Sequence, residues 1–526
     1  MRRSRLYTAT AIAAATVAVT VGAATFAIAD SGSQSGAAAP AQTLDHWVHL
    51  APDDSFVSGG QVNAPIACKR PAPDNRVSTQ LHCMTPAQMR AAYGITDQYQ
   101  GEGQTIVLVD SFGSPTAAED LNFFAQTFGM PTPDFEQVFV GGKPGYLDGL
   151  GKATGQGSGQ NGPSSAEGWA TEANLDVQWA YAMAPKAHIV LLATNTAETQ
   201  GVPGLPAAMK AIDSAIDTYP AGTVFSMSFG TDESAFAGAA AQQFAKFDET
   251  FKKGLAKGDT FLSSSGDNGS VGVIRAHRAS ATSDVPQVSY PNVSPYVTSV
   301  GGTQRQYNWT WHPTGPDVPI AANGSRTPEW WAWDQGGNSE AVGNEPGFAL
   351  VTGGGTSSVY SRPTYQDGVA SVVGNHRGVP DLSWNMAING GALVYHSYFP
   401  ATIGRPGWFL VGGTSASSPQ VAGVVALANQ ARAAAHKAPI GDLNKAIYSQ
   451  SFNQSAAFND IVTQTYGDGS VPSAHLQSNQ VWDITPGAPL TLDSVTGHAT
   501  TAGYDLTTGW GSPKGTGFVG ALAALP

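Results

Sequence analysis

The chain has 526 residues, a formal net charge of −13 and a charged fraction of 12%, about half of the usual 25% or so. Its 26 basic residues do not cluster, which argues against nucleic acid as a partner. A chain with few carboxylates gains little positive charge when they are protonated, and this favours a protein that works in acid.

The first 29 residues predict a secretory signal peptide. Three arginines within the first five residues precede a long apolar stretch that ends in Ala-Ile-Ala at 27–29, a small-x-small cleavage pattern. An uncleaved membrane anchor is the alternative, and both the general and the twin-arginine export routes remain open. No later segment is apolar enough to span a bilayer, so we expect a secreted, extracellular protein without stable membrane association.

Residues 30–83 predict a short leader or pro-segment, because they are polar, contain Pro and Gly, and show no clear periodicity. The only two cysteines of the chain, Cys68 and Cys83, lie here, and nothing around them matches a metal-ligand pattern. In an exported chain such a pair most readily forms a disulfide. The sequence leaves open whether the segment is removed.

From residue 84 to 526 the chain is regular, and we expect one large domain. Thr85 and Pro86 predict the N-cap and the first residue of a helix. Helical stretches such as 117–129 and 206–219 separate several apolar runs that predict buried strands. These runs cover residues 104–112, 187–194, 222–230, 259–267 and 295–302. Such alternation predicts an α/β fold with a parallel sheet covered on both faces, where sites lie at the carboxyl ends of the strands.

The stretch GGTSASSP, residues 412–419, predicts a nucleophilic serine, because it follows an apolar run and precedes a long Ala/Val-rich helical segment. It resembles the nucleophile motif of subtilisin-like folds. At a helix N-terminus, free N–H groups and the helix dipole favour the negative charge that develops when Ser415 reacts. Pro419 is expected in the first turn, where its missing N–H costs nothing. The alternative is that Ser415 only caps the helix.

A serine nucleophile needs a base that takes its proton. Asp110 ends the first predicted strand, as the acid of a Ser/His/Asp triad would, but none of the 11 histidines begins a His-Gly-Thr motif. A true subtilisin is therefore excluded, and a carboxylate is the remaining candidate. Glu172 and Asp176 lie one turn apart on a largely apolar helix face. A like-charged pair in such surroundings costs stability, which favours a functional role over a common surface pair.

A third acid, Asp267, follows the predicted strand that ends in Ser-Ser-Ser-Gly. Subtilisin-like folds place at this point the Asn side chain that donates to the oxyanion. An ionised Asp267 would repel an oxyanion, whereas a protonated one donates a hydrogen bond to it.

Together these residues resemble the sedolisin family of serine-carboxyl peptidases, which includes kumamolisin and tripeptidyl peptidase relatives. The motifs Glu172-x-x-x-Asp176, Ser-Gly-Asp267-x-Gly and Gly-Thr-Ser415-Ala-x-x-Pro occur in the family's order and spacing. The resemblance implies a subtilisin-like, doubly wound α/β fold in a single large domain. It also implies that Ser415 is the nucleophile, Glu172 the general base, Asp176 the acid that shares its proton, and Asp267 the oxyanion stabiliser. Reference pKa values near 4 for these acids predict an activity optimum at about pH 3–5.

The same resemblance implies one Ca²⁺ ion and a peptide-binding cleft. Oxygen ligands with two carboxylates suit calcium. The ligands would be the carboxylates of Asp460 and Asp505 and the carbonyls of Ile461, Thr501 and Gly503. Thr501 stands where the family usually has Gly. The cleft would be bordered by Ser226, Ser228 and Gly230, where a peptide could add as an extra strand.

The sequence thus predicts a secreted, acid-acting serine endopeptidase that cleaves protein or peptide substrates through an acyl-enzyme and works as a monomer. A tripeptidyl peptidase of the same family is the nearest alternative. A non-catalytic binding protein on the same fold is a second one, although every catalytic position is present. A glycosidase that uses Glu172 and Asp176 as its acid pair would leave Ser415 and Asp267 unexplained. The segment 30–83 is too short for the long folded pro-domain of the family.

Overall fold

The computed structural model describes residues 47–49, 66–69, 80–144, 163–196, 204–276, 279–305, 340–345, 350–388, 390–398, 407–462, 477–483, 491–492 and 495–526. The predicted signal peptide lies outside these residues, as does most of the segment 30–79. A search of the described helices for one with the length and apolarity of a membrane span finds none.

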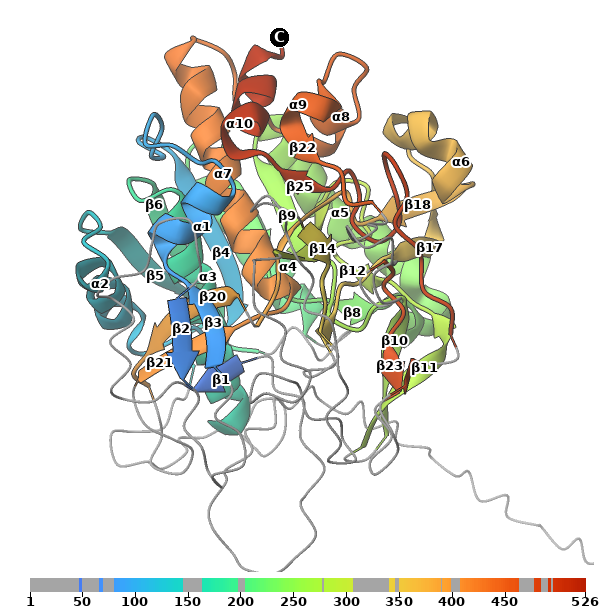
Figure 1. Cartoon of the computed structure of the whole chain (residues 1–526), viewed down its shortest axis with the longest axis horizontal. Helices are drawn as coiled ribbons and strands as arrows, with labels where there is room; N and C mark the ends of the chain where they lie inside the picture. The colour runs from blue at the N-terminus through green and yellow to red at the C-terminus, as the bar shows by residue number, and fades with distance from the viewer. Residues whose placement is uncertain are drawn as a thin grey trace, which may run out of the picture.

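An eight-stranded sheet forms the centre of the molecule (Figure 1). Its strand order is β14-β13-β9-β7-β4-β6-β5, with β19 also paired to β13, and every pair is parallel except β13–β14. The strands are β4 (Thr105–Ser111), β5 (Asp134–Val140), β6 (His188–Thr194), β7 (Val224–Met227), β9 (Thr260–Ser264), β13 (Thr298–Arg305), β14 (Glu340–Val342) and β19 (Leu382–Asn385). The predicted α/β architecture with a mostly parallel sheet is confirmed, and each of the five predicted strands is present.

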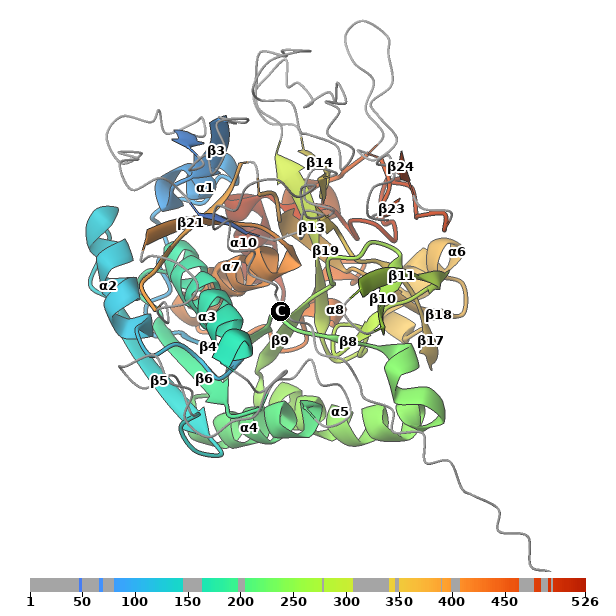
Figure 2. The ribbon, with the colours of Figure 1, turned by 90° about the horizontal axis from the view of Figure 1, so that it is seen from below.

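Helices cover both faces of this sheet, which explains why its central strands read as unbroken apolar runs (Figure 2). Along β4, Ile106 and Leu108 pack in one core with helices α3 and α7, whereas Val107 and Val109 pack in a second core with α4 and α5. These helices, together with α2 beside α3, are α2 (Ala117–Thr127), α3 (Pro163–Met183), α4 (Leu205–Thr218), α5 (Ala240–Lys257) and α7 (Thr414–Ala434).

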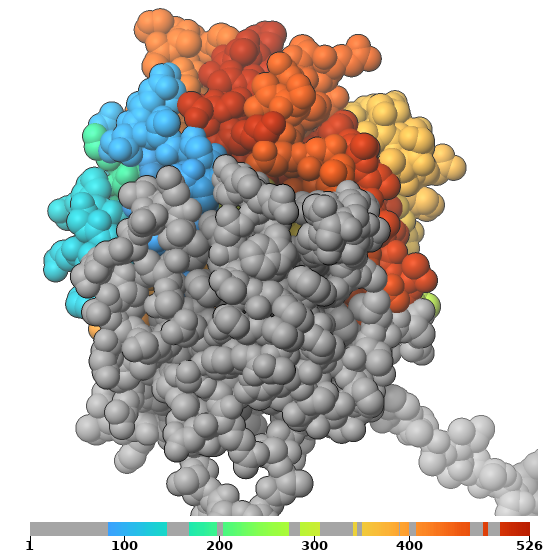
Figure 3. Space-filling view, viewed as in Figure 1, coloured from blue at the N-terminus to red at the C-terminus, as the bar shows by residue number. Residues whose placement is uncertain are grey.

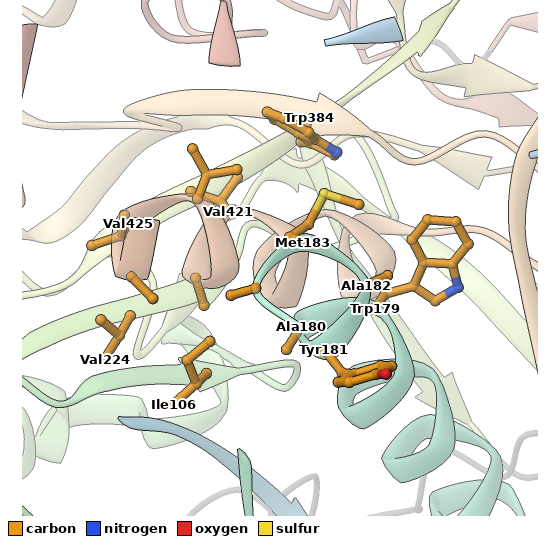
Figure 4. Packing of buried hydrophobic residues seen from close by; sticks show 14 of the residues in the cluster. Ile106, Trp179, Ala180, Tyr181, Ala182, Met183, Val224, Trp384, Val421 and Val425 are labelled. Carbon is orange, nitrogen blue, oxygen red and sulfur yellow. The ribbon is translucent and has the colours of Figure 1, made fainter. Parts of the chain in front are cut away.

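Helices α3 and α7 lie against each other over the sheet, with Ala180 and Met183 of α3 beside Val421 of α7 (Figure 4). Gly423 permits this close approach, because a Cβ atom at its position would lie 2.5 Å from Met183 Cβ and 3.0 Å from the carbonyl oxygen of Ala180. The packing fixes the helix of the predicted acid pair relative to the helix of the predicted nucleophile.

A second sheet joins the N-terminal segment to the nucleophile strand. Its order is β1-β21-β20-β3-β2. The strands are β1 (Trp47–His49), β2 (Ile66–Lys69), β3 (Gln80–Met84), β20 (Gly391–His396) and β21 (Gly407–Val411). β1 runs antiparallel to β21, with Trp47 opposite Val411. The segment predicted as a leader therefore contributes strands to the sheet that leads into residues 412–415, while its removal stays a prediction.

The two cysteines lie on neighbouring strands of this sheet. In the antiparallel pair β2–β3, Cys68 stands opposite Leu81 and Cys83 opposite Ile66. The described part of the chain contains no free cysteine. The Cys68–Cys83 disulfide itself stays a prediction.

Helix α1 (Pro86–Ala92) begins as the sequence predicts. Thr85 caps it, since its Oγ1 accepts a hydrogen bond from the Gln88 N–H at 3.3 Å while Gln88 Oε1 accepts one from the Thr85 N–H at 2.9 Å. The C-terminal segment lies against the N-terminal part of the described chain, red against blue (Figure 3). There the Thr516 N–H donates to the Gly94 carbonyl at 3.2 Å.

Short elements complete the described structure. The strands among them are β8 (Thr231–Asp232), β10 (Val271–Ala276), β11 (Ala279–Pro286), β12 (Ser289–Tyr290), β15 (Asn344–Glu345), β16 (Leu350–Val351), β17 (Gly355–Ser361), β18 (His376–Val379), β22 (Phe458–Asn459), β23 (Trp482–Asp483), β24 (Thr491–Leu492) and β25 (Ser512–Pro513). The helical ones are two 3₁₀ helices (Glu233–Ala239 and Thr364–Val369), α6 (Ala370–Val373), α8 (Leu443–Ile447), α9 (Gln454–Ala457) and α10 (Gly515–Ala524).

Candidate active site

The nucleophile candidate lies at the start of α7. β21 ends at Val411, and the N-cap Gly413 adopts φ of 100°, a left-handed conformation that favours glycine. Ser415 is the second residue of the helix and is partly exposed, whereas its neighbours Thr414 and Ala416 are buried. The predicted position of a reactive serine at a helix N-terminus is thus found.

Pro419 lies in the second turn of α7 and not in the first, because the helix already begins at Thr414. The expectation of a first-turn proline was wrong. A proline at this position has no N–H to donate to the carbonyl of Ser415, four residues earlier. That carbonyl instead accepts a hydrogen bond from Ser228 Oγ at 3.4 Å.

One member of the predicted acid pair, Asp176, contacts the same hydroxyl group. Glu172 and Asp176 are buried on α3, Asp176 completely. Ser228 lies just beyond the end of β7, and its Oγ donates to Asp176 Oδ1 at 3.1 Å. The Ser228 hydroxyl therefore contacts both a carboxyl group of α3 and the backbone of the serine that begins α7.

Asp110 adds a third buried carboxyl group that the sequence argument did not include in the site. It is the penultimate residue of β4 and is fully buried, and neither of its carboxyl oxygens has a hydrogen-bond partner within the described residues. Burial raises the pKa of Asp110 to about 8. The sequence could have indicated Asp110, because it lies at the carboxyl end of a predicted central strand. From the sequence, this position was considered only as the acid of a Ser/His/Asp triad.

The three acids influence one another's protonation. Burial raises the pKa of Asp176 well above its usual range, and the negative charges of Asp110 and Glu172 raise it further. The hydrogen bond from Ser228 acts in the opposite direction, because it favours the ionised carboxylate. Such a set holds protons at pH values where an isolated Asp would be ionised, and protons are shared among its members.

Asp267 lies in the loop after β9 and reaches the start of α7. Its Oδ1 accepts hydrogen bonds from the Thr414 N–H at 2.7 Å and from the Thr414 hydroxyl at 2.9 Å. The Val351 N–H donates to the Asp267 carbonyl at 3.1 Å and the Gly353 N–H donates to the Gly266 carbonyl at 2.7 Å, so the end of β16 and the residues after it hold this loop in place. The structure thus brings Asp267 next to the residue that precedes Ser415.

The three predicted substrate-binding residues differ in their surroundings. Ser226 is fully buried, its Oγ lies 2.8 Å from Ser418 Oγ, and its strand is paired with β4 on one side and β9 on the other. It therefore has no free strand edge for a peptide. Ser228 is buried beside Asp176, whereas Gly230 is exposed. Peptide binding at Ser226, Ser228 and Gly230 stays a prediction, and of these three residues Gly230 is the exposed one.

The predicted calcium ligands converge on one turn. Asp460 Oδ2 accepts a hydrogen bond from the Gly503 N–H at 2.8 Å, and Asp505 Oδ2 accepts one from the Thr501 N–H at 3.0 Å. Asp505 is buried and Asp460 is exposed. Burial raises the pKa of Asp505 to about 6, although the backbone N–H groups that donate hydrogen bonds to its carboxyl group lower the pKa.

This oxygen-rich set fits a hard cation such as calcium, since two carboxylates lie at a turn whose carbonyls are further oxygen donors. A search of the described residues for three or more clustered Asp, Glu, His or Cys side chains finds no metal-binding group. The predicted set contains two such side chains, so calcium remains a prediction here.

Comparison with known proteins bears on the family and the fold of the chain. A model of the subtilase family matches residues 168–469, which is more than half of the chain. Kumamolisin of Bacillus sp. (strain MN-32) is 28% identical over 413 residues, 77% of this chain and 61% of kumamolisin, so the match spans less than two thirds of that relative. Tripeptidyl-peptidase 1 of Canis lupus familiaris is 27% identical over 493 residues, 90% of this chain and 71% of that protein.

A solved structure supports the same fold. Pseudomonas sedolisin, a serine-carboxyl proteinase solved with two molecules of pseudo-iodotyrostatin, superposes with a TM-score of 0.55 at 20% identity, covering 83% of this chain and 97% of that one. The family model, the relatives and the shared fold confirm the resemblance seen in the motifs. The chain belongs to the subtilase family, and its relatives agree with the resemblance of its motifs to the sedolisin family of serine-carboxyl peptidases.

Proposed function

We propose that this protein is a secreted, acid-acting serine peptidase that hydrolyses peptide bonds through an acyl-enzyme, as an endopeptidase on protein or peptide substrates. The observation that carries the proposal is the buried carboxyl set of α3 and β4, whose member Asp176 is hydrogen-bonded to Ser228, the residue that also contacts the Ser415 backbone. A set of acids in this place supplies the proton acceptor that a serine nucleophile needs.

In the proposed reaction Ser415 Oγ attacks the carbonyl carbon of the scissile bond, and its proton passes to Glu172. The carbonyl oxygen becomes an oxyanion that accepts a hydrogen bond from protonated Asp267 and is favoured by the N-terminus of α7. Glu172 then returns the proton to the leaving nitrogen as the C–N bond breaks. Water then attacks the carbonyl carbon of the acyl-enzyme while Glu172 takes its proton. The bond from that carbon to Ser415 Oγ breaks, Glu172 returns the proton to Ser415 Oγ, and the carboxylic acid product leaves.

The pH dependence follows from the opposite protonation states that Glu172 and Asp267 must hold. Glu172 must be able to accept a proton while Asp267 keeps one, and both conditions hold together in acid. Asp176 and Asp110 stay protonated there because burial raises the pKa of each. We therefore expect the optimum at about pH 3–5.

A quenched-fluorescent peptide, assayed from pH 2 to pH 8, tests this proposal. Wild type should be active in acid, while Ser415→Ala and Glu172→Gln should each lose activity by orders of magnitude. Glu119→Gln is the matched control, because Glu119 is an exposed acid on α2. Acid activity that survives in Glu172→Gln would place the base elsewhere, and a wild type that is inactive at every pH would refute the peptidase proposal.

A tripeptidyl peptidase of the same family is the second candidate, and the similarity to a protein named tripeptidyl-peptidase 1 favours it. An enzyme of that type must bind the free amino terminus of its substrate. Two peptides of one sequence, with a free and with an acetylated amino terminus, separate the candidates. An endopeptidase cleaves both, whereas a tripeptidyl peptidase cleaves only the free form.

The proposal includes one Ca²⁺ ion with a structural role. Asp460 and Asp505 with the carbonyls of Ile461, Thr501 and Gly503 would hold it, and the convergence of both carboxylates on the same turn supports this set. The ion would neutralise charge at the turn and takes part in no catalytic step. Secretion, the monomeric state and the absence of membrane and nucleic-acid partners belong to the same proposal.

A further inference from the structure

Thr414 connects Asp267 to the nucleophile helix through two hydrogen bonds to one oxygen. Asp267 Oδ1 accepts from the Thr414 N–H at 2.7 Å and from the Thr414 hydroxyl at 2.9 Å. The hydroxyl oxygen itself accepts from the Gly266 N–H at 3.0 Å, so its own proton is directed at Asp267. Thr414 is 1% exposed and Asp267 is half-buried, so the contact is shielded from water on the side of Thr414.

This geometry distinguishes the two oxygens of Asp267. A protonated carboxyl group has one oxygen that carries the proton and one that only accepts. A proton on Oδ1 would face two donors and break their hydrogen bonds, so the proton belongs on Oδ2. The glycine at position 413 leaves space beside Asp267 Oδ2. Any other residue would place a Cβ atom there, only 2.7 Å from that oxygen.

We propose that Thr414 is a positioning residue that makes Oδ1 of Asp267 the acceptor and so directs the proton-bearing Oδ2 to the oxyanion. The inference rests on the proposed function, in which Asp267 stabilises that oxyanion. Without the Thr414 hydroxyl, only the Thr414 N–H holds Oδ1, so the carboxyl group is less firmly oriented and its proton less strictly confined to Oδ2. The donor is then misplaced for the transition state, while the substrate still binds.

Steady-state kinetics of Thr414→Val and Thr414→Ser at the acid optimum test this role. Valine removes the hydroxyl at nearly equal volume, and serine retains it. We expect Thr414→Val to lower kcat roughly tenfold, as the loss of one hydrogen bond to an ionisable group implies. KM should stay within about twofold, because an interaction made only in the transition state acts on kcat. Thr414→Ser should restore kcat to near the wild-type value.

A wild-type kcat in Thr414→Val, an equal loss in both variants, or a loss confined to KM would overturn the inference. Asp267→Ala identifies a failure of the underlying function, since it should lower kcat about 10²–10³-fold. If Asp267→Ala keeps the wild-type kcat, or wild type is inactive, the proposed function fails and the inference fails with it. If Asp267→Ala is impaired and Thr414→Val is not, only the role of Thr414 fails.

Asp267→Asn gives an independent test that does not depend on the folding of Thr414→Val. The two donors of Thr414 should hold the amide oxygen at the Oδ1 position, which places the amide NH₂ where Oδ2 lies. The variant should then keep kcat within severalfold of wild type, far above Asp267→Ala. An asparagine variant as impaired as the alanine variant would overturn the assignment of the two oxygens.

Discussion

At the scale of single residues, the carboxyl group of Asp110 is buried with no hydrogen-bond partner for either oxygen within the described residues. A carboxylate buried without hydrogen bonds is strongly disfavoured, and the group responds by remaining protonated. Burial raises the pKa of Asp110 to about 8, whereas the usual value in an unfolded chain is about 3.9. The native state therefore binds a proton between these values that the unfolded chain releases. This contribution to stability is complete below about pH 4 and is lost as the pH rises towards 8.

Replacement of this carboxyl group by an amide should change the pH dependence of stability. The free energy of unfolding of Asp110→Asn should fall less than that of wild type between pH 4 and pH 8, by up to about 1.4 kcal/mol per pH unit. Urea unfolding measured at each pH unit gives this difference. A Ser415→Ala background prevents self-digestion during the measurement.

Glu119→Gln is the control for this experiment, because it makes the same chemical change at an exposed position of α2. It should leave the pH dependence unchanged. If Asp110→Asn parallels wild type across the whole range, Asp110 is ionised in the native state and does not share protons with Asp176.

The residues of the site differ in how far sequence reveals them. Ser415, Glu172 and Asp176 stand in local motifs whose spacing carries their chemistry, and Asp267 follows a recognisable strand. Asp110 and Thr414 gain their significance only from tertiary contacts, because nothing local shows that β4 ends beneath α3 or that Thr414 donates to a distant loop. The position of Pro419 was misjudged since helix boundaries depend on where the cap forms.

At the scale of elements, the contact between α3 and α7 decides the relative position of acid and nucleophile. Central strands and these helices were predictable, since each carries a long apolar pattern. The second sheet could not be predicted, because β1 and β2 are only 3 and 4 residues long. β1 pairs with a strand that is remote in sequence, and β2 pairs within a segment that shows no periodicity. Short strands of this kind owe their conformation to the partner strand and not to a pattern of their own.

The glycine at the crossing of these helices gives a test of the packing. Gly423→Ala should cost about 1–3 kcal/mol of stability, because its Cβ would lie 2.5 Å from Met183 Cβ and the helices must separate. The same displacement moves Asp176 away from Ser415, so kcat should fall as well. Thermal unfolding and peptide hydrolysis measure the two effects.

Gly520→Ala is the matched control, since Gly520 also lies in a helix, α10, but has no atom within 4 Å of a built Cβ. There alanine should stabilise by about 0.5–1 kcal/mol through helix propensity alone. Equal effects of the two substitutions would mean that α3 and α7 do not pack as closely as described.

At the scale of the whole molecule, buried acids favour the native state at low pH. Burial raises the pKa of both Asp248 and Asp259 to about 6, and each adds stability that is lost as the pH rises through that value. His396 changes stability in the opposite direction, because burial lowers its pKa to about 3. As the pH falls below about 6.5, the unfolded chain binds a proton at this histidine before the native state does, and the native state loses stability. Burial lowers the pKa of His498 as well. Among the described residues, the buried acids with raised pKa values outnumber these two histidines, which agrees with the proposed action in acid.

Removal of calcium should destabilise the C-terminal part of the chain. At an ion concentration a hundred times the Kd, binding contributes about 2.7 kcal/mol, so a chelator should lower the Tm and added Ca²⁺ should restore it. Asp505→Asn should remove the response, since Asp505 also anchors the turn through Thr507 and Thr508. Measurement at neutral pH keeps the carboxylates ionised. A Tm that is insensitive to chelator in wild type would refute the calcium site.

The pairing of β1 with β21 has a consequence for how the enzyme is made. Trp47, among the first described residues to leave the ribosome, has Val411 as its partner, and Ser415 follows only four residues later. The sheet that precedes the nucleophile thus cannot close until β21 has been synthesised. A nascent chain that ends before β21 therefore lacks both this sheet and Ser415, so the first strand of the sheet waits for its partner throughout the synthesis of the residues between them.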